Sequence, residues 1–158
     1  LLGERVPYWN PHAKGAFIGI TLSHTRRDIL RSVLEGISYN LNSILNLFRT
    51  HLQLDSMVLI GGGAKGDVWS QILADIYNVA IKKPKHGEEA TSLGAAIIGG
   101  VGVGEFRSFD VIHQFNRIRS VQNPNPANRA VYDKMYGIFT HAYQALCPVY
   151  EELKEMES

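Results

Sequence analysis

Three consecutive glycines, Gly61 to Gly63, stand at the junction of two different hydrophobic patterns. The short apolar run 57–60 before them is typical of a buried strand, and a helical spacing of apolar residues begins after them, at Val68. Glycine lets the backbone approach a ligand closely, and the N-terminus of the following helix carries partial positive charge. This strand–turn–helix unit predicts an α/β fold in which the turn binds a phosphate group, with a tight turn that binds nothing as the alternative.

Two known phosphate-binding motifs can be compared with this turn. The dinucleotide motif G-x-G-x-x-G is satisfied by Gly61, Gly63 and Gly66, but it also requires an acidic residue about 20 positions later, at the end of the next strand. Glu88 has that offset and falls in a turn beyond the strand. A Walker A loop is excluded because no lysine follows the last glycine. We therefore expect phosphate binding by the backbone, with Lys65 either reaching the phosphate or remaining solvated.

The rest of the chain predicts alternating strands and helices. We expect strands at 15–22, 57–60 and 79–82, a short strand within the otherwise irregular segment 107–130, and helices at 28–48, 68–77, 90–101 and 132–153. Thr25 and Asp28 have nearly the spacing of a capping box, Asp67 is a candidate N-cap, and Pro148 should kink or interrupt the last helix. Three clear strands are few for a sheet flanked by helices, so we expect further strands upstream.

For several polar and aromatic residues, the sequence allows more than one position in the fold. The helical spacing places Asp75 on the surface of the helix 68–77, opposite its apolar face. Trp69 belongs either to the core or to a nucleotide pocket. The tyrosines of the last helix should pack in the core or between domains, and this tyrosine-rich stripe could also serve an interface in a homo-oligomer.

The composition excludes several classes of protein. The 16 basic and 15 acidic residues leave a net charge of +1, whereas a dedicated nucleic-acid binder carries a basic excess. No apolar run is long enough to span a bilayer. The six histidines and the single cysteine show no metal-ligand spacing, so we expect no metal site in this chain, and one lone cysteine suits the cytoplasm. The chain begins with neither Met nor a signal peptide, so we expect a piece of a longer protein.

Five segments, in this order, resemble motifs of the FGGY carbohydrate kinases. The second family signature is matched by Gly15-Ala-Phe-Ile-Gly-Ile20 followed, after seven residues, by Asp28-Ile-Leu-Arg-Ser-Val-Leu-Glu35. The other segments are Gly3-Glu-Arg-Val-Pro-Tyr-Trp-Asn-Pro11, Gly61-Gly-Gly-Ala-Lys65, Trp69-Ser-Gln-Ile-Leu-Ala-Asp75 and Leu93-Gly-Ala-Ala96. The resemblance covers nearly the whole chain and is strongest to the xylulokinase and gluconokinase branches.

The resemblance implies a fold, an activity and a site. The fold would be part of an actin-like ATPase (ribonuclease H-like) domain, and residues 1–158 would form most of the C-terminal domain of a two-domain kinase, without its first strands. Such a kinase transfers the γ-phosphoryl group of ATP to a sugar hydroxyl with Mg²⁺. The resemblance places the ATP or ADP phosphates at the glycine turn and a nucleotide contact on the following helix, which correspond here to Gly61, Gly62, Gly63, Ala64 and Asp67.

The resemblance also implies what this chain lacks. The catalytic aspartate and most sugar contacts of the family lie upstream of the matched segments, so we expect no catalytic residue here and no kinase activity from these residues alone. D-xylulose is the favoured substrate, with gluconate or another sugar as the alternative. Two other classes remain as hypotheses, a dinucleotide-binding dehydrogenase domain and a nucleotide-binding module without catalysis.

Overall fold

The computed structural model describes residues 3–156, and the chain divides into two compact units. Unit 2 comprises residues 54–126, and unit 1 comprises residues 1–53 together with 127–158. Among the described residues, no helix has the length and apolar character needed to cross a membrane. Each unit is described by itself below.

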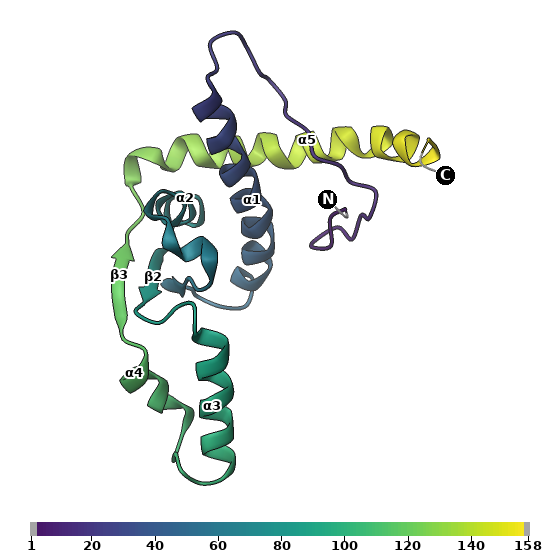
Figure 1. Cartoon of the computed structure of the whole chain (residues 1–158). Helices are drawn as coiled ribbons and strands as arrows, with labels where there is room; N and C mark the ends of the chain where they lie inside the picture. Colours follow the sequence, from purple (N-terminus) through teal and green to yellow (C-terminus); the bar gives the residue numbers. More distant parts are fainter. Residues whose placement is uncertain (1–2, 157–158) are drawn as a thin grey trace. The chain divides into compact units, whose positions relative to one another are not determined.

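Unit 2 is built on a three-stranded mixed sheet of strands β1 (Ser56–Val58), β2 (Ala80–Pro84) and β3 (Ile118–Gln122), in the order β1-β2-β3. Strands β1 and β2 are parallel, and helix α2 (Asp67–Tyr77) connects them (Figure 1). Strand β3 pairs antiparallel with β2 and lies within the segment where one short strand was expected. The predicted α/β fold is confirmed, although β1 ends two residues before the predicted boundary at residue 60.

The core of unit 2 forms where α2 packs against β2. Ile72, Leu73 and Ile76 of the helix are buried, as is Ile81 of the strand. Asn78 ends the helix in the left-handed conformation, with φ of 51°, which asparagine tolerates better than most residues. Helix α3 (Ala90–Gly102) confirms the predicted small-residue helix. The short helix α4 (Ile112–Phe115), in the segment predicted to be mainly irregular, was not expected.

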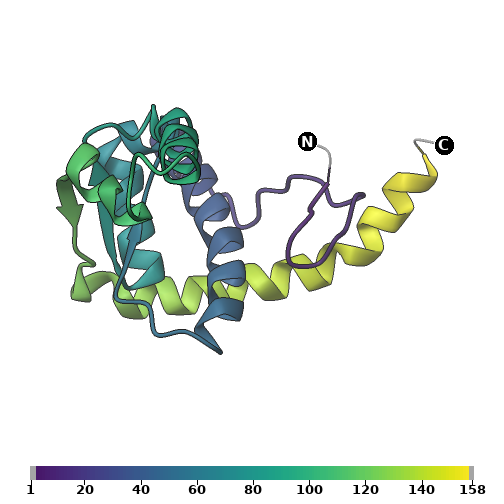
Figure 2. The ribbon, with the colours of Figure 1, turned by 90° about the horizontal axis from the view of Figure 1, so that it is seen from below.

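The described part of unit 1 contains the irregular segment 3–25 and two long helices, α1 (Arg26–Arg49) and α5 (Arg129–Glu155). The capping box at the start of α1 is present: the Asp28 carboxylate accepts hydrogen bonds from the backbone N–H and the hydroxyl of Thr25, each at 2.7 Å. The sequence predicted a kink or an interruption at Pro148. Helix α5 continues through Pro148 without interruption, and it changes direction toward its end (Figure 2).

Aromatic side chains hold α1 against α5. The ring of Tyr39 lies 6.3 Å from that of Tyr132, 6.2 Å from that of Tyr136 and 5.5 Å from that of Phe139, measured between centroids. The hydroxyl of Tyr132 accepts a hydrogen bond of 2.8 Å from Arg31 and donates one of 3.0 Å to Glu35. The prediction that tyrosines of the last helix pack in the core is therefore confirmed.

The expected strand at 15–22 is wrong. Residues 15–22 form no strand, and Phe17, Ile18 and Ile20 are all more than half exposed. A strand needs a partner for its backbone groups, and the described part of unit 1 has no other strand that could pair with it. An apolar stripe of α1 is exposed, because the face that meets α5 is the one that carries Tyr39. This exposed stripe consists of Leu30, Val33, Ile37 and Leu41.

Candidate functional site

The glycine turn links β1 to α2 and is held from two sides. Gly61 has φ of +82°, a conformation that glycine adopts at little cost. Its carbonyl accepts a hydrogen bond of 3.0 Å from the N–H of Ala64, which closes the short 3₁₀ turn Gly62–Lys65. Its own N–H donates to the carbonyl of Gly87 at 3.2 Å, so the turn after β2 is fastened to the glycine turn.

The individual glycines of this turn have different surroundings. A Cβ atom added at Gly61, Gly62 or Gly66 would meet no atom within 4 Å, so these positions face open space. A Cβ atom at Gly63 would lie 2.5 Å from Cζ3 of Trp69. Trp69, which the sequence left between core and pocket, is therefore half-buried against the turn. Gly63 is needed for packing, whereas Gly62 leaves room for a ligand.

Asp67 does not cap α2 as the sequence suggested. The N-cap is Gly66, and Asp67 is the first residue of the helix. The Asp67 carboxylate forms an ion pair with the ammonium group of Lys83, whose side chain is only 11% exposed. The hydrogen bond from Lys83 holds the pKa of Asp67 below the usual range of an aspartate, and the charge of Arg119 acts in the same direction. A buried ammonium needs a counter-charge, so Asp67 balances the charge of Lys83 on β2 and does not cap α2.

Lys65 and Glu88 form a second ion pair at the turn. The Nζ atom of Lys65 lies 2.7 Å from Oε1 of Glu88, and the two side chains are 66% and 59% exposed. The hydrogen bond to Glu88 raises the pKa of Lys65. The dinucleotide hypothesis needs an acidic residue at the end of a strand. Glu88 instead lies in the turn beyond β2 and is paired with Lys65, which argues against that hypothesis.

Asp75 was predicted on the surface and is in fact buried, with 4% of its area exposed. Its Oδ1 atom accepts hydrogen bonds of 2.8 Å from the side chain of Gln71 and 2.8 Å from the backbone N–H of Asn125. The carboxylate thus joins α2 to the segment after β3. Helical spacing could not reveal this role, because residues on nearly every side of α2 are buried.

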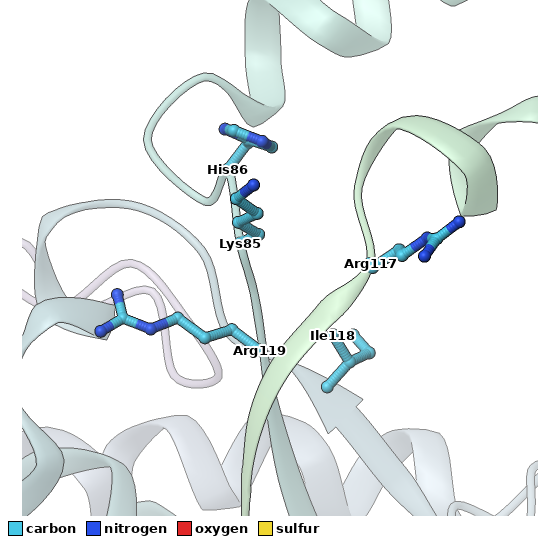
Figure 3. Close-up of a pocket in the computed structure, with 5 residues that line it drawn as sticks. All are labelled: Lys85, His86, Arg117, Ile118 and Arg119. Atoms are coloured by element: carbon cyan, nitrogen blue, oxygen red, sulfur yellow. The ribbon is translucent and has the colours of Figure 1, made fainter.

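A basic hollow of about 440 Å³ lies where β2 ends and β3 begins (Figure 3). It is lined by Lys85, His86, Arg117, Ile118 and Arg119. Figure 3 shows Lys85 and His86 next to each other, whereas the side chains of Arg117 and Arg119 point in opposite directions. These groups do not converge on one point, so the glycine turn is the better candidate for a functional site.

Sequence comparison identifies relatives of known class. Residues 1–103 match the family described as the FGGY family of carbohydrate kinases, C-terminal domain. The chain is 40% identical over 146 residues to a xylulose kinase from Staphylococcus epidermidis, an alignment that covers 91% of this chain and 29% of that protein. It is 34% identical over 156 residues to a gluconokinase from Bacillus licheniformis, covering 97% of this chain and 30% of that protein.

Solved structures with the same fold point in the same direction. A ligand-bound xylulose kinase from Lactobacillus acidophilus matches with a TM-score of 0.86 and 31% identity, over 96% of this chain and 31% of that one. Glycerol kinase from Plasmodium falciparum, solved with ADP, matches with a TM-score of 0.75 and 27% identity, over 90% of this chain and 29% of that one. These matches confirm the expected fold, part of an actin-like domain. The chain spans about 30% of the relatives' length.

Proposed function

Because the chain belongs to the FGGY family of carbohydrate kinases, we propose that its glycine turn binds the phosphates of ATP and ADP in an enzyme that phosphorylates a sugar. The observation that carries this proposal is the open space at Gly61, Gly62 and Gly66 beside the N-terminus of α2. Glycines in this place let a phosphate approach the backbone closely at the positive end of the helix. The proposal is consistent with the ADP in the structure of the Plasmodium glycerol kinase.

The binding groups of the turn would be backbone N–H groups. The first N–H groups of a helix have no partner within the helix, so Gly62 and Gly63 of the 3₁₀ turn and Asp67 of α2 supply donors at their helix starts. The N–H of Ala64 is already bonded to Gly61, so Ala64 would contribute by its small size. These donors, with the positive end of α2, would orient and stabilise phosphate oxygens.

The side chains at the turn are poorly suited to holding a metal ion. Asp67 is paired with Lys83, and Glu88 is paired with Lys65. Among residues 3–156, no three His, Cys, Asp or Glu side chains gather in a cluster that could hold an ion. We therefore propose that Mg²⁺ enters with the nucleotide, where it neutralises phosphate charge.

We further propose that residues 1–158 form most of the C-terminal domain of a longer cytoplasmic kinase. Strand β1 is an edge strand, so its outer side is open to pairing with further strands. The exposed apolar stripe of α1 would be covered by the same missing part. The catalytic base and most sugar contacts would lie there too. Sugar-dependent ATP turnover by the isolated 158 residues would contradict this proposal.

D-xylulose is the substrate that we propose, with gluconate as the second candidate. The support is the higher identity to a xylulose kinase, 40%, than to a gluconokinase, 34%. The assay is phosphorylation of each sugar by the full-length enzyme under equal conditions. A kcat/KM that is larger for gluconate than for D-xylulose would reverse this assignment.

Calorimetric titration of the full-length enzyme tests the nucleotide site. We expect binding of ADP in the presence of Mg²⁺ and no binding of NAD. The variant Gly62→Ala should fold normally because its methyl group meets no protein atom, yet it should weaken ADP binding by about tenfold since the methyl group occupies the space for phosphate. NAD binding without ADP binding, or full ADP affinity in this variant, would show that the proposed site is wrong.

A further inference from the structure

The Lys65–Glu88 ion pair stands beside the proposed phosphate site. Lys65 is the last residue of the 3₁₀ turn that begins at Gly62. Glu88 follows Gly87, whose carbonyl accepts a hydrogen bond from the N–H of Gly61. The backbone hydrogen bond therefore keeps the Glu88 carboxylate close to the glycine turn. A carboxylate in that place opposes the approach of a polyphosphate, unless its charge is balanced.

This pair can be exchanged at low cost. Both side chains are mostly exposed, at 66% and 59%, and exposed ion pairs contribute little to stability. Glu88 released from Lys65 would be solvated by water, so its release carries no burial penalty. A phosphate group with two negative charges is a stronger partner for an ammonium than a single carboxylate is. The flexible four-carbon stem of lysine allows the change of partner.

We infer that Lys65 is a phosphate-binding residue that Glu88 holds when no nucleotide is bound, and that Lys65 moves from Glu88 to a nucleotide phosphate on binding. The inference rests on the proposed function. It differs from a purely structural ion pair in one respect. Removing Lys65 and removing the charge of Glu88 should have opposite effects on nucleotide affinity, because one change deletes a ligand contact and the other deletes its competitor.

The test is calorimetric titration of the full-length enzyme with ADP and Mg²⁺. Lys65→Met should weaken ADP binding by about tenfold, and Lys65→Arg should retain most of the affinity. Glu88→Gln should tighten binding by about two- to fivefold. The matched control is Glu89→Gln, which removes one negative charge just as Glu88→Gln does. Glu89 forms no ion pair within the described residues, so the ADP affinity of this variant should stay at the wild-type value.

The outcomes separate this inference from the function on which it rests. If Lys65→Met binds ADP as tightly as the wild type while Gly62→Ala binds it weakly, the turn is a phosphate site and Lys65 has no part in it. If Lys65→Met and Glu88→Gln both weaken binding and both lower the melting temperature, the pair is structural and the inference fails. If the wild-type enzyme binds no ADP, the proposed function fails, and the inference fails with it.

Discussion

The contact between Gly63 and Trp69 makes a sharp prediction about stability. In Gly63→Ala, the new Cβ atom would lie 2.5 Å from Cζ3 and 3.1 Å from Cε3 of the indole ring. Carbon atoms in good contact lie about 3.5–4.0 Å apart, so the ring or the turn must move by about 1 Å. Overpacking of this kind costs about 1–3 kcal/mol. We expect Gly63→Ala to lower the free energy of unfolding by that amount.

Two further variants isolate the cause of this loss. Gly62→Ala adds the same methyl group in open space, so its free energy of unfolding should stay within about 0.5 kcal/mol of the wild type. Trp69→Leu removes the ring, so Gly63→Ala should cost little in that background. The double-mutant cycle should therefore give a coupling energy of about 1 kcal/mol or more between positions 63 and 69.

Urea unfolding of the wild type, the three single variants and the double variant is the appropriate assay, because the midpoint and slope give the free energy of unfolding. Thermal unfolding should agree, with a loss of about 2–4 °C per kcal/mol if the 158 residues unfold together. The reasoning is refuted if Gly63→Ala is as stable as Gly62→Ala. It is also refuted if Gly63→Ala costs as much with leucine at position 69 as with tryptophan, because the indole ring would then not be the obstacle.

Three other perturbations should report on contacts of the two units. Asp67→Asn should destabilise the protein more than Lys83→Met, because the first leaves a buried ammonium without its counter-charge. The pKa of Asp67 is lowered on folding, so the ion pair stabilises the protein above the pKa of the unfolded carboxyl and loses this effect as the pH falls below about 4. Urea unfolding between neutral and acid pH should therefore show a smaller pH dependence in Asp67→Asn than in the wild type. Tyr132→Phe should cost about 1–3 kcal/mol in urea unfolding, because its hydroxyl bonds to two charged side chains of α1, and the control Tyr39→Phe should cost much less. Thr25→Ala should cost about 1 kcal/mol by weakening the capping box of α1, seen as a lower urea midpoint.

Features that depend on neighbours in sequence could be predicted from the chain alone. The glycine turn, the strand before it and the helix after it follow from a change of hydrophobic period across three glycines. The capping box of α1 needs only Thr25 and Asp28, three positions apart. The prediction of helices at 68–77 and 90–101 was correct to within about one residue for the same reason.

Features that depend on distant partners could not be predicted in this way. Residues 15–22 have the composition of a strand, but pairing requires a second strand, and composition does not supply one. Asp75 satisfies a backbone N–H that lies 50 positions away, at Asn125. Asp67 was placed correctly near the turn but with the wrong partner, because the charge of Lys83 comes from the strand that follows α2.

The two lysines at the glycine turn differ in burial, and this difference sets what each can do. Lys83 is 11% exposed, so it cannot leave Asp67 without stranding a buried charge, and that pair is fixed. Lys65 is 66% exposed and can leave Glu88 for another anion at little cost. A site for a polyphosphate needs its own carboxylates neutralised and at least one cation to spare. Lys83 meets the first condition for Asp67, whereas Lys65 balances Glu88 only until a phosphate takes its place. Lys65 is therefore the cation to spare, and Glu88→Gln should remove the charge that is left unbalanced, which nucleotide titration should detect as tighter binding.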